Sequence, residues 1–112
     1  MSASTLKERL RADLKAAMRE RKPAEAGVIR TLIAAIDNAE AVPIDGLEER
    51  LRQRETIGDV ARRQLNAAAL DAVLASETES RLAAAGDYER HGRPDDAARL
   101  RDEAGLIARY RA

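Results

Sequence analysis

Apolar residues recur every three or four positions through most of this chain, which is the period of an amphipathic helix. The first such segment covers residues 4–22, and its apolar stripe consists of Leu6, Leu10, Leu14, Ala17 and Met18. We expect Ser4 or Thr5 to cap its start, because their hydroxyls can accept from free backbone N–H groups. Pro23 ends the segment, since the residue before a proline resists the helical conformation.

A second helix is predicted over residues 23–40, because Pro23 also suits the first turn of a helix. Its apolar face is the broadest in the chain and contains Val28, Ile29, Leu32, Ile33 and Ile36. We therefore expect it to be the most buried helix, and Pro43 closes it.

The third predicted helix covers residues 67–91, with Asn66 as its N-cap and Gly92 as its stop. One face of it carries Leu70, Leu74, Thr78, Arg81, Ala85 and Tyr88. The fourth runs from Pro94 to about Tyr110, and its stripe is Ala97, Leu100, Ala104 and Ile107.

Residues 43–65 show no firm pattern, and we expect an irregular, mobile connection there. No segment reads as a strand. The sequence thus predicts a single all-α domain over residues 1–112. Its four main helices should pack as two antiparallel hairpins, with the irregular connection between the second and third helices.

Composition narrows the function classes. There is no cysteine among the 112 residues, which excludes disulfides, thiolate zinc sites and a cysteine nucleophile. Charged residues make up 36% of the chain and sum to zero net charge, so any electrostatic signal must be local. No apolar run is long enough for a signal peptide or a membrane span, and we expect a cytoplasmic protein.

Candidate chemistry is sparse. His91 is the only histidine, and beside the stop at Gly92 it is best explained as a residue near a helix C-terminus. Glu77 and Arg81 have the spacing of a helix-surface ion pair, which explains them better than acid–base catalysis does.

The acidic residues near the fourth helix, Asp95, Asp96, Asp102 and Glu103, match no calcium loop. The first two are explained by their place at the positive end of a helix dipole. We expect no catalytic residue, no metal and no cofactor.

One local feature is electrostatic. The first 22 residues hold seven basic and three acidic side chains, a net charge of +4. Lys7, Arg11, Lys15 and Arg19 step by four, which predicts one ridge along a helix. Two interpretations remain open: the ridge contacts phosphates, or it is a solvated face whose side-chain stems cover the edge of the core.

Two blocks of the sequence resemble the GatB/YqeY family. The first block comprises Leu6-Lys7-Glu8-Arg9-Leu10, Asp13-Leu14-Lys15-Ala16-Ala17-Met18, Val28-Ile29-Arg30-Thr31-Leu32 and Ala34-Ala35-Ile36-Asp37-Asn38-Ala39-Glu40. The second block comprises Tyr88-Glu89-Arg90-His91-Gly92-Arg93, Ala97-Ala98-Arg99-Leu100-Arg101 and Glu103-Ala104. The blocks occur in the family's order and cover both ends of the chain.

The resemblance implies an all-helical, YqeY-like stand-alone protein. One branch of the family is the tail of the B subunit of the glutamine-dependent Glu-tRNA/Asp-tRNA amidotransferase, which helps to hold tRNA while chemistry occurs in other domains. The family label, carbon–nitrogen ligase with glutamine as amido-N-donor, comes from that enzyme. Members usually continue into a second helical subdomain, which we expect to be absent here, and residues 42–65 are longer and less regular than is typical.

Two functional hypotheses follow. The first is a non-catalytic, tRNA- or translation-associated module whose basic contacts are Lys7, Arg11, Lys15, Arg19, Lys22 and Arg30. The alternative is a protein–protein adaptor that binds no nucleic acid. Amidotransferase activity in the chain itself has no support from its residues, because no activated nucleophile is visible.

Overall fold

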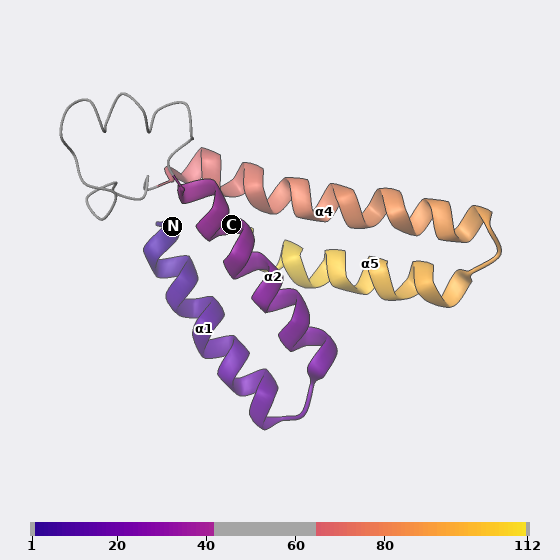
Figure 1. Ribbon diagram of the computed structural model, residues 1–112, viewed down its shortest axis with the longest axis horizontal. Coiled ribbons are helices and arrows are strands. Elements are labelled where there is room, and N and C mark those ends of the chain that lie inside the picture. Colours follow the sequence, from indigo (N-terminus) through magenta and orange to yellow (C-terminus); the bar gives the residue numbers. More distant parts are fainter. Residues whose placement is uncertain (1, 42–64, 112) are drawn as a thin grey trace.

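The structure is a computed structural model that describes residues 2–41 and 65–111 (Figure 1). Its helices are α1 (Ala3–Arg19), α2 (Pro23–Glu40), α4 (Ala67–Arg90) and α5 (Pro94–Ala108). These described residues contain no strand, so the predicted all-α fold with four main helices is confirmed. The irregular connection predicted for residues 43–65 lies outside the described part, apart from Leu65, which is buried.

The helices form two antiparallel hairpins, as predicted: α1 packs on α2, and α4 packs on α5 (Figure 1). Between the hairpins, α2 is the element that contacts both α4 and α5. The two hairpins diverge, so the turn between α1 and α2 lies at the bottom of the view and the turn between α4 and α5 lies at its right (Figure 1). This arrangement leaves one side of the α1–α2 hairpin uncovered by the rest of the described chain.

Both hairpin turns are built in the same way. After α4, Gly92 has a φ of 73°, and the N–H of Arg93 donates to the carbonyl of Tyr88 at 2.8 Å. After α1, Arg21 has a φ of 56°, and the N–H of Lys22 donates to the carbonyl of Ala17 at 2.9 Å. Each is a Schellman stop, followed two residues later by the proline that begins the next helix.

Two sequence predictions about the ends of α1 are wrong. The helix ends at Arg19 and not near Lys22, because Arg21 takes the left-handed conformation that usually requires glycine. Its N-cap is Ser2 instead of Ser4 or Thr5: the Ser2 hydroxyl accepts from the N–H of Thr5 at 3.1 Å. The predicted N-cap at Asn66 and the predicted stop at Gly92 are confirmed.

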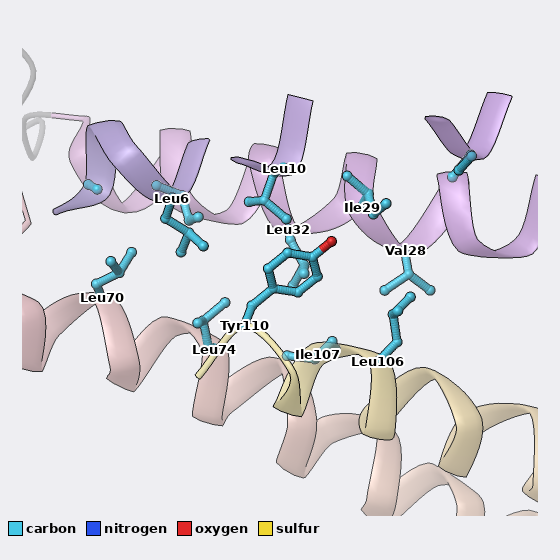
Figure 2. Packing of buried hydrophobic residues seen from close by; sticks show 14 of the residues in the cluster. Leu6, Leu10, Val28, Ile29, Leu32, Leu70, Leu74, Leu106, Ile107 and Tyr110 are labelled. Carbon is cyan, nitrogen blue, oxygen red and sulfur yellow. The ribbon is translucent and has the colours of Figure 1, made fainter. Parts of the chain in front are cut away.

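Apolar side chains from both hairpins meet in one core (Figure 2). The largest fully buried side chains are Leu6, Leu10, Ile29, Leu32, Ile36, Leu74 and Ile107. As expected, α2 contributes more of them than any other helix, namely three of the seven. Met18 departs from the prediction, because its side chain is 57% exposed instead of joining the α1 stripe.

The part of the α4–α5 hairpin beyond α2 is held differently. Its buried apolar positions are the alanines Ala85, Ala97 and Ala104, which lie outside the main core cluster. This contact between α4 and α5, the alanine seam, buries little apolar area because alanine side chains are small. Ion pairs lie beside it: Arg81 of α4 bonds Glu77 at 2.8 Å and Glu103 of α5 at 3.0 Å. These ion pairs, the Arg81 bridge, therefore tie α4 to α5 where apolar burial is small.

Candidate nucleic-acid interface

The uncovered side of the α1–α2 hairpin carries four exposed cations. Arg11, Lys15 and Arg19 come from α1, and Arg30 comes from α2. The Arg30 guanidinium lies 3.6 Å from the sulfur of the exposed Met18, which is three residues after Lys15 on α1, so Met18 links Arg30 to the cations of α1. We call the four cations together with Met18 the basic face.

The cations of the basic face are not neutralised within the described residues. Arg11, Lys15 and Arg19 form no ion pair or hydrogen bond there, and Arg30 contacts the neutral Met18. Glu8 is exposed on α1, and Asp37, two turns after Arg30 on α2, is bonded to Lys7, so the four cations outnumber the acidic groups beside them. Such a surface attracts anions over a distance of about a Debye length.

Lys7 occupies a different position from the rest of the predicted ridge. Its ammonium bonds Glu40 at 2.6 Å and Asp37 at 3.3 Å, both on α2. The Lys7 side chain is only 16% exposed, and Glu40 is buried. These bonds raise the pKa of Lys7, with the Glu40 bond as the largest cause. Lys7 thus joins α1 to α2 and does not extend the basic face.

Lys22 is exposed at the turn after α1, and its ammonium lies 3.5 Å from a carboxylate oxygen of Glu20. Arg9, another cation of the first segment, is placed over the ring of Tyr110 at 4.6 Å. Arg21, at the same turn, is exposed and lies outside the basic face as defined. The other basic residues of the first segment either have partners (Lys7, Arg9 and Lys22) or belong to the basic face.

His91, Glu77 and Arg81, the candidates for acid–base chemistry, have structural partners. The Nδ1 atom of His91 lies 2.7 Å from the carbonyl oxygen of Asp87, one turn earlier in α4, and His91 is the C-cap. Glu77 and Arg81 form the i,i+4 ion pair that their spacing predicts. Across residues 2–41 and 65–111, no group of three or more His, Asp or Glu side chains is arranged to hold a metal ion.

Sequence reasoning missed two properties of this region. The exposure of Met18 was hidden because its position matches the apolar spacing of α1. The pairing of Lys7 with Glu40 had a weak signal: Glu40 is a carboxylate in the last turn of α2, where the helix dipole disfavours it unless a cation is near.

None of the helices in the described residues is sufficiently long and apolar to cross a membrane. The chain has no match among curated proteins or among solved structures. A family model described as Yqey-like protein matches residues 7–111, which include every described helix in whole or in part. Because that match covers nearly the whole chain, this protein belongs to the YqeY-like family.

Proposed function

We propose that this protein is a non-catalytic module that binds the phosphate backbone of tRNA through its basic face. The observation that carries the proposal is the set of four exposed cations, Arg11, Lys15, Arg19 and Arg30, without an acidic partner among the described residues. Membership of the YqeY-like family supports it, because that family resembles the tRNA-holding tail of the amidotransferase B subunit.

The geometry of α1 suits a strand of phosphates. Successive cations at Arg11, Lys15 and Arg19 advance by about 6 Å along the helix axis, because each step spans four residues. Neighbouring phosphates of one nucleic-acid strand are similarly spaced. Each phosphate that is bound releases condensed counterions, so affinity should fall steeply as salt concentration rises.

Lys7 and Lys22 are not part of the proposed contact set. The Lys7 ammonium is already bonded to two carboxylates, and Lys22 is close to Glu20. A phosphate would have to compete with those acids at either position. The proposal therefore rests on the basic face alone.

Binding of fluorescently labelled tRNA, measured by anisotropy over a range of salt concentrations, tests the proposal. We expect the wild-type chain to bind at low salt. In the triple variant Arg11→Gln, Lys15→Gln and Arg19→Gln, the magnitude of the slope of log affinity against log salt should fall by roughly 2–3, since each lost phosphate contact removes about 0.7–0.9.

A matched control removes three charges elsewhere, through Arg90→Gln, Arg93→Gln and Arg99→Gln on the α4–α5 hairpin. These arginines are exposed and pair with nearby acids. The control should keep the wild-type salt slope. Equal losses in both triple variants, or no tRNA affinity of the wild-type chain at low salt, would contradict the proposal.

A further inference from the structure

A groove of about 560 Å³ lies between the first turns of α2 and the C-terminal half of α5. Its floor is aliphatic, formed by Val28 of α2 and Leu106 of α5, which lie close together at one end of the core (Figure 2). Ala24 and Gly105, which are the two smallest kinds of residue, also line it. The groove is therefore a shallow aliphatic channel between two helices.

Gly105 lines this channel at a cost in helix stability. A glycine inside a helix is less favourable than alanine by about 1 kcal/mol. Gly105 has no left-handed φ, and a side-chain carbon built on it would meet no atom within 4 Å. Neither backbone conformation nor close packing thus requires glycine here, and the consequence of having it is an unfilled groove.

The rim of the groove carries one uncompensated charge. Glu25 and Arg109 bond across it at 3.3 Å, and Arg99 bonds Glu103 at 3.3 Å. Asp102, on the same rim, has no partner in the part of the chain that the structure describes. The groove therefore presents a free carboxylate beside an aliphatic floor, which is complementary to an apolar surface that carries a cation.

We propose that this groove docks an amphipathic helix of a partner protein. Aliphatic side chains of that helix would enter between α2 and α5, and a lysine or arginine of it would bond Asp102. From Asp102 through Leu106 of α5 to its C-cap Arg109, the groove spans about 10 Å, or two helical turns. This is the length over which helix-in-groove recognition places its anchor residues.

This site goes beyond the proposed tRNA contact and is spatially distinct from it. Val28 lines the groove, whereas Arg30, two residues later in α2, belongs to the basic face. Residues two apart on a helix point about 160° from one another, so the two surfaces lie on different sides of α2. One chain can hold an RNA and a protein helix together.

The test is a selection from a phage library of randomised amphipathic helical peptides on the full chain, with counter-selection on the Gly105→Leu variant, which fills the groove. We expect the enriched peptides to carry aliphatic residues at helical spacing and a lysine or arginine. Their affinity, measured by anisotropy, should fall about tenfold or more in Gly105→Leu, a loss that one blocked aliphatic anchor can produce.

A charge swap gives a second readout that does not depend on filling the groove. Asp102→Lys is a rim substitution of an exposed residue, and it should weaken the enriched peptides about tenfold. Replacing the basic residue of an enriched peptide by glutamate should restore the binding of that peptide to the Asp102→Lys variant. Wild-type tRNA affinity in both variants would show that the basic face is unaffected, so the two proposals can fail separately.

The proposal would be overturned if the selection enriched no peptide that binds the wild-type chain more tightly than Gly105→Leu. Enriched peptides without a basic residue, or binding insensitive to Asp102→Lys, would also overturn it. Sedimentation showing that the wild-type chain self-associates through this groove, with Gly105→Leu monomeric, would replace the partner helix by a second copy and equally count against it.

Discussion

Tyr110 donates its phenol hydrogen to a carboxylate oxygen of Asp13 at 2.5 Å, although the two residues are 97 positions apart. The Tyr110 side chain is buried, and the Arg9 guanidinium lies over its ring. Arg9 also donates to the carbonyl of Arg109 at 3.4 Å. These contacts fasten the residues after α5 onto α1, which otherwise packs mainly on α2.

The substitution Tyr110→Phe removes this hydrogen bond and keeps the ring. Hydrogen bonds to charged groups contribute about 1.5–3 kcal/mol, so we expect a loss near 2 kcal/mol in the free energy of unfolding at pH 7. Urea denaturation followed by circular dichroism measures it. An unchanged denaturation midpoint would show that the Asp13 contact does not stabilise the fold.

The difference in stability between wild type and Tyr110→Phe should depend on pH. Burial, and then the bond to Asp13, raises the pKa of Tyr110. A raised pKa means that the folded state favours the neutral phenol, so this stabilisation is complete below the unfolded pKa of about 10 and is lost as pH rises above it. The stability difference between wild type and Tyr110→Phe should therefore shrink above about pH 10. A constant difference up to pH 11 would contradict this.

The two hairpin turns predict opposite effects of substitutions at equivalent positions. Arg21 adopts a φ of 56°, which costs a non-glycine residue about 1–2 kcal/mol, so Arg21→Gly should stabilise the fold by about 1 kcal/mol. Gly92 adopts a φ of 73°, and Gly92→Ala should destabilise it by a similar amount. Thermal denaturation of both variants provides the measurement, and shifts of the same sign would refute the shared turn geometry.

Much of the fold follows from local signals in the sequence. Pro23 and Pro43 indicated the bounds of α2, and Asn66, Gly92 and Pro94 marked the ends of α4 and the start of α5. The end of α1 was harder to predict, because the residue at which the helix stops is Arg21 and not a glycine. A left-handed arginine has no signature in the sequence and is imposed by the turn into α2.

The candidate site was only partly predictable, for a geometric reason. Four residues of an α-helix turn through about 400°, so a side chain every four residues shifts by about 40° around the axis at each step. Over three steps, from Lys7 to Arg19, the ridge rotates by about 120°. Lys7 therefore faces α2 while Lys15 and Arg19 face away from it, and which end is covered depends on where α2 packs.

The Arg81 bridge predicts a large difference between two arginines of α4. Arg81→Met should cost about 3 kcal/mol, because it leaves the half-buried carboxylates of Glu77 and Glu103 without their partner where the alanine seam buries little area. Arg90→Met removes an exposed pair with Asp87 and should cost less than about 1 kcal/mol. Chemical denaturation compares the two, and equal losses would show that the bridge has no special importance.

Lys7 offers a way to separate stabilisation of the fold from contact with RNA. Glu40 is only 4% exposed and lies in the last turn of α2, so Lys7→Met leaves a buried carboxylate at the negative end of a helix dipole. Breaking such a pair costs about 3–5 kcal/mol, and the remaining exposure of Lys7 places the expected loss near the lower value. The double variant Lys7→Met with Glu40→Gln should recover part of it, because a neutral amide needs no counter-charge.

The same variant should leave tRNA binding intact under conditions where it remains folded. Lys7→Met is expected to keep the wild-type salt slope, since its ammonium already bonds Glu40 and Asp37. Arg11→Gln, on the basic face, should instead lower the slope by roughly 0.7–0.9 and leave stability nearly unchanged. Anisotropy titrations paired with urea denaturation measure both quantities. If Lys7→Met lowered the slope as much as Arg11→Gln, the Lys7 ammonium would have to leave its carboxylates for a phosphate, and the basic face would then begin at Lys7.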